Sequence, residues 1–175
     1  AAEFDRPANE LGTWRGNELT QSLINDGKNS GAFFTFSTDK NKEVNYRIAI
    51  SFVSIENAKE NLKSENLNIS FDEYLNNTQK VWNNHLGKIK ISTSNDDKKV
   101  QFYTNFYHSL IHPNIVSDVN GDYMGADFKV YNNSNGNEHY SSFSVWDTYR
   151  TQAQLLAMLF PKESSEMMQS LVNFA

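Results

Sequence analysis

The chain has 175 residues, a formal net charge of −5 at pH 7, and no cysteine. The acidic balance argues against nucleic acid or an anionic membrane surface as a partner, and the absence of cysteine excludes disulfides, thiolate catalysis and cysteine-ligated zinc sites. No stretch of about 18 apolar residues predicts a membrane span, and the first residues lack the basic start and apolar core of a signal peptide.

Residues 1–53 have the patterns of β-structure. The run 32–37 predicts one strand, and the run 44–53 predicts a second, because its apolar residues alternate as they do in a half-buried strand. The polar residues 39–42 lie between these two runs and predict a hairpin turn.

After Ser54 the apolar period becomes helical, which predicts a first helix from residue 55 to about residue 65. Ser70 and Glu73 have the spacing of a capping box, so a second helix is expected to begin there. Its apolar stripe consists of Phe71, Tyr74, Leu75, Thr78, Val81, Trp82 and Leu86. Gly87 is expected to end this helix in the left-handed conformation, and the alternation in 88–92 predicts a short strand.

A third helix is expected to begin at Asp96 or Asp97 and to be ended by Pro113. The residues expected on its buried face are Val100, Tyr103, Tyr107, Leu110 and Ile111, with Phe102 and Phe106 beside them.

The chain then returns to β-structure before its last helices. Short strands are predicted at 115–116, 128–131 and 142–145, with turns at Asn120-Gly121 and at 132–137. Two helices are predicted to follow, at about 147–160 and 164–175, separated by Pro161.

The candidate functional residues lie in the segment 143–150, where Trp146, Asp147 and Arg150 place an aromatic plane, a carboxylate and a guanidinium close together. In sugar-binding sites, aromatic faces cover apolar C–H groups while charged groups bind the hydroxyls. The same residues also fit a structural interpretation. Trp146 would then be core, Asp147 a helix cap and Arg150 half of a surface ion pair, and the residues alone leave both interpretations open.

Two other patterns are weaker. Asp118, Asn120 and Asp122 have the spacing that opens a calcium loop, but Tyr123 stands where that loop requires glycine, so a hairpin turn is favoured. His108 and His112 are four residues apart, as zinc ligands can be, but the sequence offers no third ligand, and core or rim histidines are favoured. The sequence also shows no pair of acidic residues placed as the general acid and base that cleave a glycosidic bond would be.

Several motifs, in this order along the chain, resemble glycoside hydrolase family 92, a family of α-mannosidases. They lie at 51–58, 61–62, 71–72, 82–89, 102–110, 117–125 and 143–150, with Pro161 behind the last. The resemblance extends over nearly the whole chain from residue 44 onward.

The resemblance implies an α+β chain made of parts of two larger domains. Residues 1–53 would be the C-terminal strands of a β-sandwich, residues 54–95 linker helices and a strand, and residues 96–175 the first helices of an (α/α)6 catalytic barrel. The 175 residues would then be a piece of a larger protein, inactive alone, with the remainder of that protein as a partner.

The family removes terminal mannose from α-linked glycans with inversion and requires calcium. The resemblance therefore implies that Trp146 and Asp147 line the mannose subsite and that Arg150 lies close behind. The general acid (Glu), the general base (Asp) and the main calcium ligands are expected beyond residue 175. Mannose-containing glycans are the expected partners, and the location is expected to be exported: periplasmic, cell-surface or secreted. A non-catalytic carbohydrate-binding module or a structural interaction module is the alternative.

Overall fold

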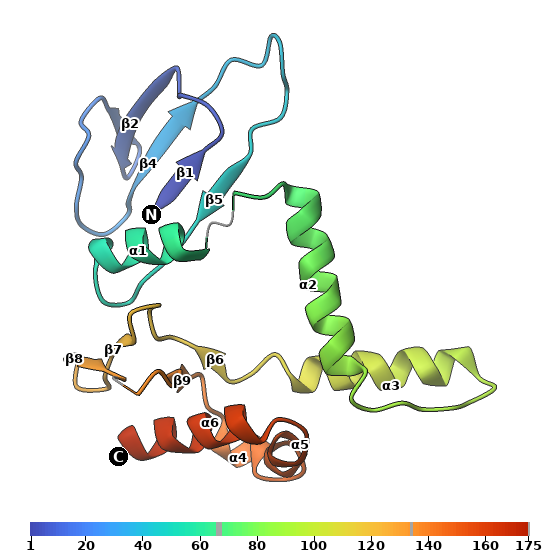
Figure 1. Ribbon diagram of the computed structural model, residues 1–175. Coiled ribbons are helices and arrows are strands. Elements are labelled where there is room, and N and C mark those ends of the chain that lie inside the picture. Colours follow the sequence, from blue (N-terminus) through green and yellow to red (C-terminus); the bar gives the residue numbers. More distant parts are fainter. Residues whose placement is uncertain (66–67, 134, 175) are drawn as a thin grey trace. The chain divides into compact units, whose positions relative to one another are not determined.

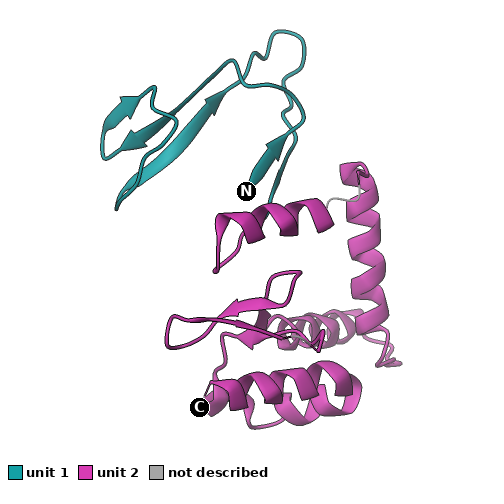
Figure 2. Ribbon diagram, turned by 60° about the vertical axis from the view of Figure 1, so that its left-hand side comes forward, with its two compact units in different colours: residues 1–49 teal, residues 50–175 magenta. Residues whose placement is uncertain are grey.

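The computed structural model describes residues 1–65, 68–133 and 135–174. Figure 1 shows the elements along the chain, and Figure 2 shows its division into two compact units, Ala1–Ala49 and Ile50–Ala175. The described residues combine six α-helices with four small β-sheets, so the chain is of mixed α and β structure. None of these helices has both the length and the apolar character that a membrane crossing requires.

The first unit contains two antiparallel sheets. Three strands form one sheet in the order β3-β2-β4, with bounds Glu18–Thr20, Glu10–Arg15 and Ser30–Thr35. The other sheet pairs β1 (Ala2–Phe4) with β5 (Tyr46–Ile48).

The predicted hairpin around residues 39–42 is wrong. β4 pairs with β2 and β5 pairs with β1, so this loop connects strands of two different sheets. The strand predicted at 44–53 shortens to β5, which pairs with the three residues of β1. The alternating apolar side chains of Tyr46 and Ile48 are exposed rather than half-buried.

The second unit begins with two helices close to their predicted bounds, α1 (Ile55–Glu65) and α2 (Phe71–Leu86). The capping box of α2 is confirmed: the amide of Glu73 donates to Ser70 Oγ at 3.3 Å, and the amide of Ser70 donates to the Glu73 carboxylate at 2.9 Å.

The apolar stripe of α2 is only partly packed. None of its residues is buried, and Phe71 is 74 % exposed. However, Leu86 packs against the core of this unit, and the centroid of the Trp82 ring lies 4.6 Å from that of the Tyr107 ring.

Gly87 has a φ of −69° and not the expected left-handed value, while its amide bonds back to the carbonyls of Asn83 and His85. Residues 88–92 form no strand and instead lead to the next helix as an irregular segment.

The core of the second unit lies where α3 (Asp96–Ser109) meets α5 (Gln152–Leu159). Phe106, Leu156 and Phe160 are buried together there, with Tyr103 and Leu110 partly buried against them. The predicted buried face of α3 is therefore displaced toward Phe106, and Val100 is 66 % exposed.

Short strands lie between α3 and the last helices. β6 (Asn114–Ile115) pairs with β9 (Tyr140–Ser141), and β7 (Asp122–Met124) pairs with β8 (Val130–Asn132). The strands predicted at 128–131 and 142–145 therefore lie at β8 and β9, displaced by about two residues from the predicted bounds. The turn at Asn120-Gly121 is confirmed by a hydrogen bond of 2.8 Å from the Gly121 amide to the Asp118 carbonyl. Only Gly121 in this turn has positive φ, at 86°, so it is not the type I′ turn that needs two such residues.

The chain continues with α4 (Val145–Thr148), α5 and α6 (Pro161–Asn173). The helix predicted at 147–160 is divided at Thr151, which has a φ of 65°. Pro161 begins α6 rather than separating two helices, because the first residue of a helix needs no amide donor. The last residue of the helix predicted at 164–175 lies outside the described residues.

Candidate functional site

The short helix α4 presents Trp146 to solvent. The indole is 87 % exposed, whereas Phe106 and Leu156 in the core of the same unit are buried. An exposed indole has a free face for stacking on the C–H groups of a ligand. The interpretation of Trp146 as core does not hold for the described residues.

Asp147 is the third residue of α4, and Ser144 is the N-cap. The amide of Asp147 donates to the carbonyl of Ser144 at 2.9 Å, and the hydroxyl of Ser144 donates to Asp147 Oδ2. The interpretation of Asp147 as an N-cap residue is therefore wrong. Its carboxylate is exposed and is oriented by a neighbouring hydroxyl.

Arg150 lies against the aromatic side chain that precedes it. Its Nε donates to Tyr149 Oη at 2.6 Å, and its guanidinium carbon is 5.2 Å from the centroid of the Tyr149 ring. Within the described ranges no carboxylate forms an ion pair with Arg150, so it is joined neither to Asp147 nor to another acid. The structure thus places Trp146 and Asp147 side by side on α4 and turns Arg150 toward Tyr149.

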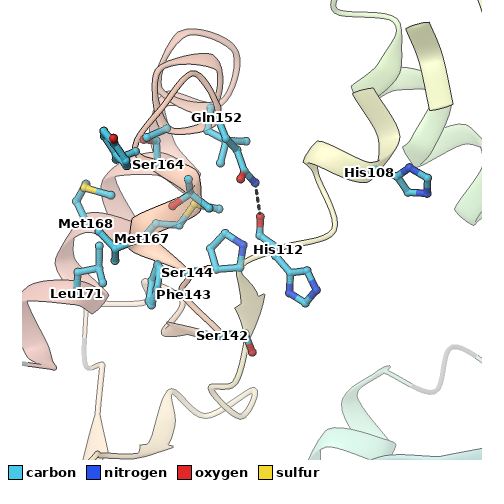
Figure 3. A pocket seen from close by; sticks show the side chains of 16 residues that line it. His108, His112, Ser142, Phe143, Ser144, Gln152, Ser164, Met167, Met168 and Leu171 are labelled. Atoms are coloured by element: carbon cyan, nitrogen blue, oxygen red, sulfur yellow. Dashed lines mark hydrogen bonds between the residues drawn. The ribbon is translucent and has the colours of Figure 1, made fainter. Parts of the chain in front are cut away.

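A cavity of about 540 Å³ lies behind α4, between the end of α3, α5 and α6 (Figure 3). Val145, Thr148 and Tyr149 line it, together with apolar side chains such as Met167 and Leu171. Trp146, Asp147 and Arg150 are not among the described residues that line it. The cavity is therefore not formed by the predicted sugar-binding residues, although Ser144 and Tyr149, which contact Asp147 and Arg150, line it.

Figure 3 shows His108 and His112 at the rim of this cavity. His112 lies beyond the end of α3 at Ser109, so the two imidazoles do not share a helix face as the zinc interpretation required. The carbonyl of His112 accepts a hydrogen bond of 3.0 Å from the Gln152 amide. In residues 1–65, 68–133 and 135–174, no group of three or more His, Asp or Glu side chains could hold a metal ion, so these residues do not fit the expected calcium.

A buried carboxylate that the sequence did not reveal lies at Asp118, which is 5 % exposed. It accepts three side-chain hydrogen bonds, from Ser51 Oγ at 2.7 Å, Asn57 Nδ2 at 2.8 Å and Asn61 Nδ2 at 2.6 Å. The sequence offers no signal for it, because its two asparagine donors lie four residues apart on one face of α1 but far from Asp118 along the chain. We name Asp118, Ser51, Asn57 and Asn61 the Asp118 clasp.

Asp122 is a second carboxylate surrounded by amides. It accepts from Asn132 Nδ2 at 2.7 Å, Asn57 Nδ2 at 3.0 Å and Asn120 Nδ2 at 3.0 Å. These hydrogen bonds, that of Asn132 foremost, hold the pKa of Asp122 below its usual value of 3.8. Asp118 and Asp122 thus both accept hydrogen bonds from side-chain amides of this chain.

Tyr140 and Glu166 are buried side chains near the junction of β9 and α6. Burial, and then the charge of Glu166 foremost among nearby acids, raises the pKa of Tyr140 to about 12. A phenol with this pKa stays protonated near neutral pH. Glu166 Oε1 lies 3.5 Å from Lys162 Nζ, and the neighbouring Ser170 on α6 accepts from the Tyr140 amide. Glu166 therefore belongs to the packing of α6 rather than to the surface of α4.

The family model of the glycosyl hydrolase family 92 catalytic domain matches residues 57–175. No curated protein matches the chain significantly. Three similar solved structures are the family 92 glycosyl hydrolase CcMan5, with 30 % identity over 99 % of this chain and a TM-score of 0.85, and two proteins of Bacteroides thetaiotaomicron. These two are the α-mannosidase BT3965, with 25 % identity over 99 % of this chain and a TM-score of 0.85, and the inverting mannosidase BT2199, with 26 % identity over 98 % and a TM-score of 0.86.

The α-mannosidase BT3965 has also been solved in complex with mannoimidazole. This chain covers 23 % of the CcMan5 chain and 24 % of the BT3965 and BT2199 chains. It therefore spans about a quarter of the length of the structures that it matches.

Proposed function

Because the chain belongs to glycoside hydrolase family 92, we propose that the protein removes terminal α-linked mannose from glycans, with inversion at the anomeric carbon. The observation that carries this proposal is the match of the family's catalytic domain to residues 57–175. The mannosidases among the similar structures support mannose as the sugar.

In this proposal Trp146 stacks on the terminal mannose and Asp147 binds its hydroxyls, with Arg150 close behind. The free face of the Trp146 indole supports the stacking role. The exposed carboxylate of Asp147, oriented by Ser144, supports the hydroxyl-binding role, because charge-assisted hydrogen bonds are the stronger ones.

Inversion needs a carboxylic acid that protonates the leaving group and a carboxylate that activates water on the opposite face of the sugar. Glu166 is buried against β9, and Asp118 and Asp122 are held by amides, so none of these acids fits either role. We expect a Glu as the acid and an Asp as the base, both from other segments of the protein.

The remaining parts of the proposal concern architecture, metal and location. We propose that residues 1–53 end a β-sandwich, that residues 54–95 link it to an (α/α)6 barrel, and that residues 96–175 begin this barrel. We also propose a calcium requirement, with the ligands in other segments, where the ion would supply positive charge to orient sugar hydroxyls. The protein is expected to be exported, because the family it belongs to acts on glycans outside the cytoplasm.

The test uses the protein at its full natural length and the methyl glycoside of an α-linked mannobiose, whose blocked reducing end releases no anomeric mixture of mannose. Proton NMR should show β-mannose as the first product, because inversion at an α-linkage gives the β-anomer. Chelation should abolish turnover and added calcium should restore it. Absence of mannose release overturns the proposed function, and α-mannose as the first product overturns inversion.

A non-catalytic carbohydrate-binding role is the second candidate, and the exposure of Trp146 is the observation that favours it. This role predicts that the full-length protein binds mannose and hydrolyses no mannoside, and that Trp146→Ala weakens the binding. Isothermal titration with mannose and with its C2 epimer glucose would separate specific binding from a nonspecific aromatic contact.

A further inference from the structure

The Asp118 clasp contains a buried carboxylate that has no role in the proposed chemistry. Across the described ranges, no lysine, arginine or histidine forms an ion pair with Asp118. Its oxygens are instead satisfied by one hydroxyl and two amides, and a buried carboxylate left without donors would be strongly destabilising. The three donors must therefore stay within hydrogen-bonding distance of the Asp118 carboxylate for the fold to remain stable.

Asn61 contributes both ends of its amide to the clasp. Its Nδ2 donates to Asp118 Oδ1 at 2.6 Å and to the carbonyl of Ile50 at 2.9 Å, while its Oδ1 accepts from the amide of Val119 at 3.0 Å. Rotation of this amide by half a turn would break all three hydrogen bonds. Asn61 thus joins α1 to both the side chain and the backbone of the turn at residues 118–121.

The same turn leads into the strands that precede α4. Tyr123 follows it in β7 and is buried, with its ring stacked on the imidazole of His139 at a centroid distance of 3.7 Å. His139 directly precedes β9, which pairs with β6 and whose Tyr140 amide donates to Ser170 of α6 at 3.0 Å. After β9, three residues connect directly to α4 with Trp146.

We propose that Asp118 is a positioning residue, which through Asn57 and Asn61 fixes the segment that carries Trp146 and Asp147. This inference rests on the proposed function, because it assigns the clasp to the sugar site of that function. Asp118 does not touch the sugar. It holds the turn from which the Tyr123–His139 stack and β9 set the position of α4.

The test is a reciprocal exchange in the protein at its full natural length. Asp118→Asn keeps the shape of the side chain, and its carbonyl oxygen can still accept from Ser51 and Asn57, but its amide then faces the amide of Asn61. Asp118→Asn should lower kcat/KM for α-mannosides about tenfold, since a small misplacement of a binding group can cost up to about a hundredfold. The amides of residues 140–150 should exchange hydrogen faster. The double variant Asn61→Asp with Asp118→Asn restores a donor–acceptor pair at this contact, although the new carboxylate cannot donate to the Ile50 carbonyl as the Asn61 amide does. It should therefore be less impaired in both properties than Asn61→Asp alone, which loses the same bond to Ile50 and also places two carboxylates against each other.

The matched control is Ser70→Ala, which removes the cap of α2 and lowers stability without touching the clasp. The inference is overturned if Asp118→Asn behaves as this control does, with reduced thermal stability but unchanged kcat/KM and unchanged exchange in residues 140–150. A double variant that is no less impaired than Asn61→Asp alone also overturns it. If the unsubstituted protein hydrolyses no mannoside, the proposed function fails, and hydrogen exchange alone then decides whether Asp118 positions this segment.

Discussion

The residues of α4 are divided between two surfaces. Successive residues of a helix point about 100° apart, so even four residues cover more than one direction. Val145 and Thr148 line the cavity, whereas Trp146 is exposed and Asp147 carries a solvent-facing carboxylate. One turn of helix can therefore be anchored by one face while it binds a ligand with the other.

The role of Asp147 predicts a specific loss of activity. In the full-length protein, Asp147→Asn should lower kcat/KM for α-mannosides about tenfold to a hundredfold, because it removes the charge from a hydrogen bond to the sugar. Asp72→Asn is a matched control, since Asp72 is also an exposed residue in the first turn of a helix. Turnover within about twofold of the unsubstituted protein would contradict the role of Asp147.

Asp122 predicts a pH dependence of stability. Its pKa is lower in the folded protein than its ordinary value of 3.8, so its contribution to stability is complete above that value and is lost as pH falls through the folded-state pKa. The difference in Tm between the unsubstituted protein and Asp122→Asn should therefore be constant from about pH 7 to about pH 5 and should shrink below about pH 4. Other carboxylates, such as Asp5 and Asp127, are present in both proteins and cancel in this difference. A difference in Tm that does not change down to about pH 2.5 would contradict the prediction.

At the scale of elements, the stability of α2 depends more on its N-terminal capping box than on the burial of its side chains. None of its residues is buried, so little apolar packing holds it within this chain. Ser70→Ala should lower the free energy of unfolding of residues 1–175 by about 1 kcal/mol, as loss of a serine cap commonly does. Urea denaturation measures this change, with the exposed Ser92→Ala as a control outside any helix. Equal midpoints for the two variants would mean that the capping box contributes nothing to stability.

Helices were more predictable from the sequence than strands. The capping box at Ser70 and the periodic apolar residues of α1 are local signals, and both predicted the correct element. The strand predicted at 44–53 is only three residues long, and its partner β1 lies more than forty residues away in the sequence, so no local signal marks the paired residues. Gly87 adopted an ordinary helical conformation, which its position after the apolar stripe did not predict.

The same difference between local and long-range signals applies to the candidate site. Trp146 and Asp147 are adjacent in the sequence, so the pair was visible in one segment, and their role stays a prediction. The Asp118 clasp was not visible, since its asparagine donors are 57 and 61 residues from Asp118 along the chain. Side chains that meet only through folding leave no periodic signal, and a buried carboxylate with neutral partners lacks even a complementary charge to look for.

At the scale of the whole molecule, large apolar side chains remain exposed in each unit. Leu23, Ile24 and Leu19 are examples in the first unit, and Phe71, Val100 and Met158 are examples in the second. Contiguous exposed apolar surface usually marks a place where other protein is bound. The structures that this chain matches are about four times as long, which fits a fold in which further polypeptide covers such surfaces.

This exposure predicts different behaviour for residues 1–175 alone and for the protein at its full natural length. The isolated residues should bind the dye ANS strongly and should self-associate as their concentration rises, because apolar side chains such as Phe71 and Val100 have no covering partner among the described residues. The full-length protein should bind little ANS per molecule, because the same side chains are packed. Dye fluorescence and size-exclusion chromatography with light scattering measure the two properties. A strictly monomeric 1–175 with no more ANS fluorescence than the full-length protein would show that these side chains form no binding surface, and would count against residues 96–175 as the beginning of a larger barrel.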